Sequence, residues 1–460
     1  MSVVRGRNLS GNSKKKRILV TGIYRSIGNG DGVICECVAA LLKEEFPDAE
    51  VVIHDLFGKT EFEGIRYHEM KISADDSRVP GAEEDTEALL RATRKDMDRA
   101  KARALATRTG LIDKEYKHIT RKLVRNRINV ENVAKEHFDL VVFAGGQMLM
   151  NEFAPVIADY ITEFEKTNVP VIIQAVGLGP VYSKRVKEMS GRALMLSNVK
   201  SISVRDSLGK ISEVFGVPEN RLVKTYDTAV WTADVYNPEK IPDSTYGQGL
   251  IGLGMMFPTN ISFSGATKFW LEILKKLEAE KVEWQIFVNG SPRDMAYAVY
   301  VMEEALKRGI IKNLSGRISG ADEESAGSSG IDAPTDYLTS GDLNSSLRNR
   351  YLHKRPREPR ELVQEIAEYR AIISQRLHSH IIAASLGIPS VAIYWDDKVT
   401  EFFGDLGHPE RCYTIKSGAD EIYAALTKAV DEGVDMSVIE KMKDHSRRTL
   451  LSGIEPLELK

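Results

Sequence analysis

The sequence features with the clearest chemical potential are basic side chains in the C-terminal quarter of the chain. Arg376 and His378 lie two residues apart after the apolar run 371–374. On an extended strand end, such residues point to the same side, so we expect both to face one cleft. Lys398 follows the next apolar run, residues 390–394, at the same predicted sheet edge. Arginine pairs with carboxylates, lysine with phosphates, and histidine exchanges protons near neutral pH, so this cluster suits a small, multiply charged anion.

The same segment contains an H-x-H pattern, formed by His378 and His380. Two histidines can contribute to a zinc site, but such a site needs further ligands. No third ligand has a matching spacing, so we expect no metal. His380 is then expected on a helix face or behind the site.

Further candidates follow predicted strands in the first half of the chain. Arg205 comes just after the apolar run 201–204, and Asp206 beside it can cap the next helix. Arg205 is therefore either a guanidinium that donates paired hydrogen bonds to a ligand in the cleft or a partner in a structural salt bridge. Glycine-rich turns follow other strands, at residues 28–32, 145–146 and 177–180. Such turns either present backbone amides to an anion or make the tight connection between strand and helix.

Strands that alternate with helices must position these residues. Short, continuously apolar runs are typical of parallel strands buried on both faces. They recur in both halves, at residues 17–23, 51–55, 140–143, 171–174, 201–204, 250–255, 284–289, 371–374 and 390–394. The sequence therefore predicts an α/β protein with two Rossmann-like, doubly wound parallel-sheet domains. Open sheets of this kind bind ligands at the carboxyl ends of their strands, so the two domains should face a shared cleft.

Composition changes along the chain suggest where the domains begin and end. We expect a disordered basic tail over residues 1–16, an N-terminal domain over 17–240, a C-terminal domain over 249–435 and a helical extension over 436–460. Residues 236–248 resemble a linker. Two segments interrupt the domains: a charged helical insert at about 86–134 and a long polar loop at about 315–359.

The overall charge excludes several classes of protein. The 460 residues include 63 Lys and Arg against 66 Asp and Glu, a net charge of −3, and 42% are hydrophobic. This composition is that of a soluble globular chain and excludes collagen and wholesale disorder. Without a basic excess, we expect no nucleic-acid partner. Within the insert, residues 91–127 carry a local net charge of +9. That segment is either a solvated helical hairpin or a surface for anionic lipid headgroups or a phosphorylated carrier.

The cysteines and the N-terminus bear on localisation. Three cysteines are too few for a disulfide framework, which favours a reducing compartment. The apolar stretch 18–20 is too short for a signal-peptide core, and no run approaches the length of a transmembrane helix. We expect a cytoplasmic protein, with the inner face of the membrane as the alternative location.

Together these motifs resemble the polysaccharide pyruvyl transferase family, from about residue 17 to about residue 430. The most specific part runs from Ser374 through Arg376 and His378 to Lys398, and the segment around Arg205 is second. The resemblance implies a fold like that of the GT-B glycosyltransferases. It also implies phosphoenolpyruvate as the donor, no further cofactor, and a sugar of a cell-surface polymer or its lipid-linked precursor as the acceptor.

The resemblance also assigns roles by position. The donor-binding and catalytic positions of the family are matched by Arg205, Arg376, His378 and Lys398, and further substrate-binding positions by Asn29, Asp31, Gly145 and Gly146. We hypothesise that the histidine transfers a proton, while the three cations hold the carboxylate and phosphate and stabilise the departing phosphate. Gln147 stands where the family usually has a third glycine, and the first turn is longer than its usual form.

Two other functions are compatible with this layout. A glycosyltransferase that uses a nucleotide sugar would share the two-domain fold. We find no acidic residue clearly placed after a second-domain strand to bind ribose hydroxyls, and the basic cluster suits a smaller donor. A non-catalytic saccharide-binding protein of the same fold is the other alternative. Retention of all four charged positions speaks against it.

Overall fold

A computed structural model of the chain describes residues 15–25, 28–58, 130–237, 249–258, 261–312 and 350–457. Almost all of the expected basic tail, most of the linker, most of the charged insert with its +9 segment, and most of the polar loop lie outside these residues. Of the helices in the part described, none is both long and apolar enough to cross a membrane.

The first half of the chain forms a six-stranded parallel sheet with the order β2-β1-β3-β4-β5-β6. Its strands are β1 (Arg17–Gly22), β2 (Glu50–Asp55), β3 (Leu140–Leu149), β4 (Val171–Leu178), β5 (Val199–Val204) and β6 (Leu222–Lys224). The helices are α1 (Asn29–Glu45), α4 (Val130–Ala134), α5 (Ala154–Glu165), α6 (Lys184–Leu194), α7 (Leu208–Phe215) and α8 (Thr232–Tyr236), with short 3-10 turns η1 (Glu219–Arg221) and η2 (Thr228–Trp231).

The second half forms a five-stranded parallel sheet with the order β11-β10-β9-β7-β8. Its strands are β7 (Ile251–Gly254), β8 (Trp284–Phe287), β9 (Ala371–Ser374), β10 (Ser390–Ile393) and β11 (Cys412–Tyr413). The helices are α9 (Phe263–Ala279), α10 (Pro292–Lys307), α12 (Pro359–Ala367), α13 (Leu377–Ser385), α14 (Asp397–Asp405), α15 (Ala419–Glu432) and α16 (Met436–Ser452), with turns η5 (Pro409–Arg411) and η6 (Glu455–Leu457).

Burial on both faces explains why most strand positions are apolar. In β1, Ile18 and Val20 lie in a central apolar cluster, whereas Leu19 between them lies in an outer cluster formed with α5 to α7. Successive side chains of a strand point to opposite faces, so helices must cover both faces of the sheet. The predicted α/β class with two doubly wound parallel sheets is thereby confirmed.

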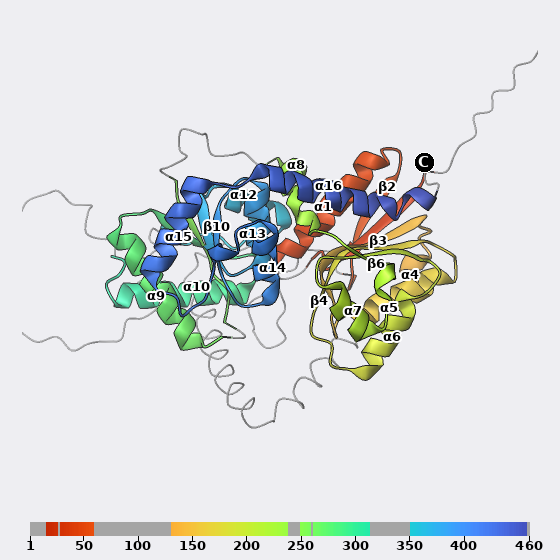
Figure 1. The fold of residues 1–460 in the computed structure, drawn as a ribbon, viewed down its shortest axis with the longest axis horizontal. Coiled ribbons are helices and arrows are strands. Elements are labelled where there is room, and N and C mark those ends of the chain that lie inside the picture. The colour runs from red at the N-terminus through yellow and green to blue at the C-terminus, as the bar shows by residue number, and fades with distance from the viewer. Residues whose placement is uncertain are drawn as a thin grey trace, which may run out of the picture.

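The central apolar cluster is shared by the two halves of the chain. It contains side chains from β1, β3 and α1 together with side chains from β9, α12, α13 and α16. Figure 1 shows α1 and α13 close to the junction of the halves, and α16 running from the second half across to the first. The Gln174 amide of β4 donates to the backbone oxygen of Ser446 in α16 over 3.3 Å. The two sheets are therefore joined by a continuous core.

One end of the expected polar loop is packed. Residues 350–358 are described, and Tyr351 among them is 7% exposed. Its ring stacks on Trp284 of β8, with the ring centroids 4.5 Å apart. Leu352 forms an isolated parallel bridge with Ile286 of the same strand. This end of the segment therefore covers the edge of the second sheet.

The strand order fixes where a ligand can bind. In the first sheet, β1 lies between β2 and β3, and in the second, β7 lies between β8 and β9. Beside β1 and beside β7, the chain crosses from one side of the sheet to the other, so the connections to neighbouring strands run in opposite directions. Open α/β sheets bind ligands at the carboxyl ends of the strands at such a position. The turns that follow β1, β3, β7 and β9 should therefore form the site.

Candidate functional site

The segment after β9 places Arg376 and His378 differently from the extended geometry that we expected. Arg376 caps α13 with an extended backbone (φ −79°, ψ 124°), and the helix begins at Leu377. His378 therefore lies in the first helical turn, where successive side chains are about 100° apart. The expectation that both side chains leave one extended strand end on the same side is wrong. Each side chain instead meets its own buried carboxylate.

Arg376 is fixed by Asp294 in the first turn of α10. Its Nε and Nη2 donate to Asp294 Oδ2 over 3.0 and 2.6 Å. Asp294 is 1% exposed, and its other oxygen accepts from the backbone of Phe257 over 2.9 Å. The Arg376 side chain is 32% exposed, and Nη1 makes no hydrogen bond to the described residues. One side of the guanidinium is thus anchored, while another remains open to the cleft.

Arg205, Asp227 and His378 form a contact between the two halves. Arg205 follows β5, and its Nη1 donates to Asp227 Oδ2. That oxygen lies 3.7 Å from His378 Nε2, and Arg205 Nη1 lies 3.5 Å from the same nitrogen. Asp227 also caps η2 by accepting from the backbone of Ala229 over 2.9 Å. The side chains of Arg205 and Asp227 are only 8% and 6% exposed, so this is a buried ion pair.

Electrostatics stabilise the charged forms of this pair. Burial alone would raise the pKa of Asp227, but Arg205 and His378 hold it well below its ordinary value. Burial alone would lower the pKa of Arg205, but Asp227 and the nearby Asp206 and Asp31 raise it. Both groups are therefore ionised at neutral pH. A pocket beside them is lined by Arg205, Asp227 and Lys398 together with apolar side chains of α13, α14 and α16.

Lys398 joins the cluster from the first turn of α14. Its Nζ donates to Gln147 Oε1 of the first half over 3.2 Å and lies 4.4 Å from the centre of the Trp395 ring. Burial lowers the pKa of Lys398 to about 8. Asp396 and Asp31 oppose that shift, whereas Arg205 and Arg376 add to it. Arg205 and Lys398 line the same pocket, and Arg376 is near enough to lower the pKa of Lys398.

The N-terminal turn of α1 forms the opposite wall of the cleft. A Cβ added to Gly30 would lie 2.4 Å from His378 Nδ1, so the helix backbone rests directly against the imidazole ring. Asp31 Oδ1 would lie 2.7 Å from a Cβ on Gly146, whose φ is +79°. Only glycine adopts that backbone readily and leaves this space. Asp31 and Gly146 are thus brought to the cleft beside His378.

Two of the predicted site residues have mainly structural contacts. Asn29 is 2% exposed, and its Nδ2 donates to the backbone oxygen of Pro356 over 2.8 Å. Its backbone N–H donates to Asn289 over 2.8 Å, so Asn29 joins the halves. A Cβ on Gly145 would lie 2.6 Å from Ile34 Cγ2, which shows how closely α1 packs on β3.

His380 lies behind the site. It is fully buried, and its Nε2 donates to the backbone oxygen of Ser374 over 3.0 Å. Burial lowers the pKa of His380 to about 4, so the ring is neutral at pH 7. Its ring packs edge-on against Phe403, with the centroids 5.0 Å apart.

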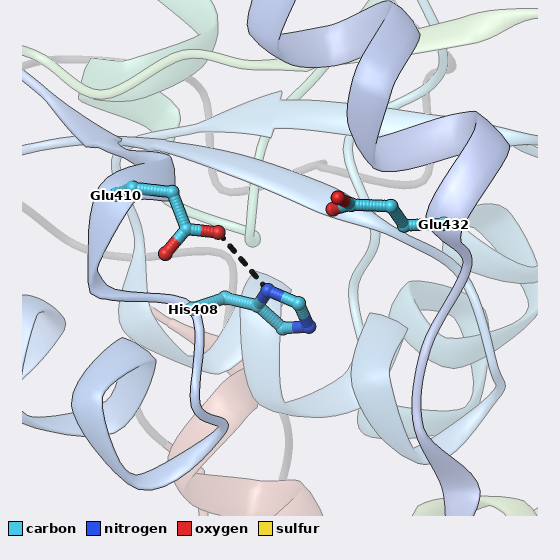
Figure 2. A group of neighbouring side chains, drawn as sticks. All are labelled: His408, Glu410 and Glu432. Atoms are coloured by element: carbon cyan, nitrogen blue, oxygen red, sulfur yellow. Dashed lines mark hydrogen bonds and ion pairs between the residues drawn. The ribbon is translucent and has the colours of Figure 1, made fainter.

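A different group has metal-ligand residue types, at the surface near the end of α15. Figure 2 shows His408, Glu410 and Glu432, whose ligand atoms lie within 4.8 Å of one another. His408 Nδ1 lies 3.1 Å from Glu410 Oε1, and Arg411 donates to Glu432 over 2.9 Å. Because side chains already balance these charges, we assign no metal to the group. Sequence reasoning did not single it out, since Glu432 has no motif spacing to the other two.

Three residues of the site were missed by sequence reasoning. Asp227 follows β6 just as Arg205 follows β5, so its position after a strand could have indicated it. Asp294 lies three residues after Ser291, whose side chain accepts from the Asp294 backbone N–H in a capping pattern. Gly30 was visible only as part of a turn, because its contact with His378 comes from the distant half of the chain.

The buried ion pair predicts a specific loss of stability. Replacing Asp227 with asparagine leaves Arg205 buried without a countercharge, so the free energy of unfolding at pH 7 should fall by about 3–5 kcal/mol. Because folding lowers the pKa of Asp227, its stabilisation is present above the ordinary pKa of 3.8 and is lost as the pH falls below it. The deficit of the Asp227→Asn variant should therefore shrink in strong acid. Urea denaturation of the wild type and the variant, at pH 7 and in strong acid, measures this difference in the free energy of unfolding.

A matched control is the exposed pair of Arg17 and Glu50, whose atoms lie 3.0 Å apart. The Glu50→Gln variant should lose at most about 1 kcal/mol. Equal losses in the two variants would contradict the assignment of a buried, uncompensated charge.

Comparisons with solved structures give matches along almost the whole chain at low identity. The UDP co-structure of MnaA from S. aureus has a TM-score of 0.48 and 13% identity, with 95% of each chain covered. The UDP-GlcNAc 2-epimerase from Neisseria meningitidis bound to UDP-GlcNAc has a TM-score of 0.46 and 13% identity. The match covers 96% of this chain and 99% of the epimerase. The glycosyltransferase SnogD from Streptomyces nogalater has a TM-score of 0.39 and 12% identity. The match covers 97% of this chain and 99% of SnogD.

The search of curated proteins found no match. The family model for polysaccharide pyruvyl transferases matches residues 30–397, which include every predicted site residue except Asn29 and Lys398. Each of these two lies within one residue of an end of the match. The chain therefore belongs to the polysaccharide pyruvyl transferase family.

Proposed function

We propose that the protein transfers the pyruvyl group of phosphoenolpyruvate to a sugar of a cell-surface polysaccharide or its lipid-linked precursor. The products are a ketal on the sugar and free phosphate. Phosphoenolpyruvate is a co-substrate in this proposal, and the reaction requires no resident cofactor or metal. We place the reaction in the cytoplasm, at the inner face of the membrane when the acceptor is lipid-linked. The observation that carries the proposal is the convergence of three cations and a histidine in one cleft.

The cations Arg205, Arg376 and Lys398 suit a small trianion. Like charges in a poorly solvated cleft repel one another, and this repulsion adds to burial in lowering the pKa of Lys398. A bound anion relieves the repulsion. Phosphoenolpyruvate carries a carboxylate and a phosphate, which match the planar guanidinium fork and the compact ammonium group.

The anchoring of the arginines supports this role. Arg376 directs Nε and Nη2 to a single oxygen of Asp294, which holds the side chain without using all of its donors. Arg205 Nε is buried and has no hydrogen-bond partner among the described residues. An unpaired buried donor is destabilising unless a ligand or water satisfies it. Both arginines thus retain donors for an anionic substrate.

His378 is placed to transfer a proton. Protonation of the methylene carbon of phosphoenolpyruvate gives its neighbouring carbon oxocarbenium character, and a sugar hydroxyl attacks that carbon. Phosphate then leaves, and a second hydroxyl closes the ketal. The carboxylate of Asp227 lies 3.7 Å from His378 Nε2 and orients the imidazole toward the cleft. Arg205, Arg376 and Lys398 stabilise the charge that develops on the departing phosphate.

Incubation with phosphoenolpyruvate and a panel of glycans tests the proposed reaction. Phosphate release should equal the amount of sugar that gains pyruvate minus water, measured by a phosphate assay and mass spectrometry. The His378→Gln variant should be slower by about 10²–10⁴-fold, the usual contribution of a general acid. The control is His408→Gln, a histidine outside the cleft, which should retain wild-type turnover.

Other outcomes of the same assay would contradict the proposal. Wild-type turnover by the His378→Gln variant would remove the proton-transfer role. Release of a nucleoside diphosphate from a nucleotide sugar would support the glycosyltransferase alternative. Glycan binding with neither product would support a non-catalytic protein.

The lowered pKa of Lys398 predicts a pH dependence of binding. Because this lysine has a pKa of about 8, it loses its charge as the pH rises through that value. The affinity for phosphoenolpyruvate should therefore fall between about pH 7 and pH 9. Arginine stays charged over this range, so the Lys398→Arg variant should show a flat profile. Calorimetric titrations at several pH values measure this, and an equal decline in the variant would assign the effect to another group.

The close contact of Gly30 with His378 predicts that this position accepts only glycine. A Cβ at residue 30 must displace the imidazole, so Gly30→Ala should lower turnover by about 10²-fold, as small misplacements of catalytic groups do. The control is Gly28→Ala, because a Cβ at Gly28 meets nothing within 4 Å. The turnover of the Gly28→Ala variant should stay close to that of the wild type. Similar turnover in the two variants, at matched melting temperatures, would show that the histidine tolerates displacement.

A further inference from the structure

The proposed reaction needs a group that accepts the proton of the attacking hydroxyl. Addition to phosphoenolpyruvate places a proton on the methylene carbon and the sugar oxygen on the neighbouring carbon. His378 supplies the first proton, so the same imidazole cannot also remove the hydroxyl proton in that step. A carboxylate in the cleft is the natural general base.

Most carboxylates near the cations are already engaged. Asp227 and Asp294 accept from arginines, Asp206 accepts from the backbone N–H of Leu178, and Asp396 accepts from the backbone N–H of Lys398. Asp31 differs from these four. Its carboxylate accepts no hydrogen bond and forms no ion pair within the part of the chain that the structure describes. Glu401 and Asp405 of α14 also line the pocket and accept no hydrogen bond from the described residues, but both are exposed. Asp31 is therefore the partly buried carboxylate beside His378 that is free to meet a substrate hydroxyl.

The position of Asp31 also fits a base that acts opposite His378. It lies in the first turn of α1, directly after Gly30, whose backbone rests against the His378 ring. Its Oδ1 rests over the backbone of Gly146, where the absence of a side chain leaves it space. Arg205 and Lys398 are close enough for Asp31 to raise the pKa of each. Acid and base thus come from opposite halves and flank the proposed donor site.

We infer that Asp31 is the general base that accepts the proton of the sugar hydroxyl attacking phosphoenolpyruvate, an inference that rests on the proposed function. As the bond from the sugar oxygen to the central carbon forms, that hydroxyl proton moves to Asp31, while the His378 proton moves to the methylene carbon. The carbon–oxygen bond to phosphate then breaks, and phosphate takes the electron pair and the proton from Asp31. The second hydroxyl closes the ketal and returns a proton to His378.

A purely electrostatic role for Asp31 makes a different prediction. If the carboxylate only balanced Arg205 and Lys398, removing its charge would strengthen the binding of a trianion and leave the chemical step unchanged. A general base instead contributes to turnover, and only in its ionised form. Binding and turnover must therefore be measured separately, and turnover must be followed over pH.

The experiment compares Asp31→Asn, Asp31→Glu and the control Asp397→Asn with the wild type. Asp397 carries the same charge on α14, is exposed, and accepts from Tyr394 over 2.8 Å. Calorimetry gives the dissociation constant of phosphoenolpyruvate, and phosphate release with a sugar acceptor gives kcat from about pH 4 to pH 9. Melting temperatures show that each variant folds.

For Asp31→Asn we expect kcat to fall by about 10²–10⁴-fold with a dissociation constant that is unchanged or lower. The acid limb of the wild-type pH profile should be lost, Asp31→Glu should recover part of kcat, and Asp397→Asn should match the wild type. Three outcomes would overturn this inference and leave the proposed function standing. They are wild-type kcat in Asp31→Asn, an unchanged acid limb in that variant, and loss of its phosphoenolpyruvate binding. Failure of the wild type itself to convert phosphoenolpyruvate would overturn the proposed function, and this inference with it.

Discussion

The apolar cluster between the two sheets is the constraint on which the rest of the structure depends. Ile18 and Val142 enter it from the first sheet, and Ile372 and Ala392 enter it from the second, with α1 and α13 between them. Neither half could bury this layer alone, because each would expose a continuous apolar face. The shared core therefore holds the first turns of α1 and α13 together. The contact of Gly30 with His378 is a direct consequence of that packing.

The cleft carries several cations although the chain as a whole is not basic. The chain as a whole has a net charge of −3, and buried carboxylates hold the two arginines that line the cleft. Burying an isolated charge is costly, so Asp227 and Asp294 are what allow Arg205 and Arg376 to stand in the cleft. Each carboxylate takes only some of the donors of its arginine. In the proposed function, the remaining donors and Lys398 together bind the anionic substrate.

The same carboxylates connect charge to catalysis. Asp227 contacts Arg205 and faces His378, so one buried oxygen positions both the proposed binding group and the proposed proton donor. Because η2 holds Asp227 and the shared core holds η2 against α13, this arrangement is built in before substrate binds. Such preorganisation lowers the cost of reaching the transition state.

Residue patterns alone predicted the parallel sheets, because strands buried on both faces are apolar at most positions, as in β3 and β4. Position after a strand also indicated Arg205 and Lys398. The start of α13 was not predictable, since Arg376 caps it and arginine is not a typical N-cap residue. The pairing of Arg376 with Asp294 joins residues 82 positions apart, and only the folded chain shows it. Contacts of this range depend on packing, which no local pattern encodes.

Titration of the wild type and of the Arg376→Gln variant with phosphoenolpyruvate, followed by calorimetry at pH 7, tests the central claim most directly. The cleft should bind one molecule per chain, and the variant should bind at least about tenfold more weakly, because a charged hydrogen bond contributes about 1.5–3 kcal/mol. Absence of binding to the wild type, or equal affinity in the two proteins, would contradict the claim that these cations form a site for phosphoenolpyruvate.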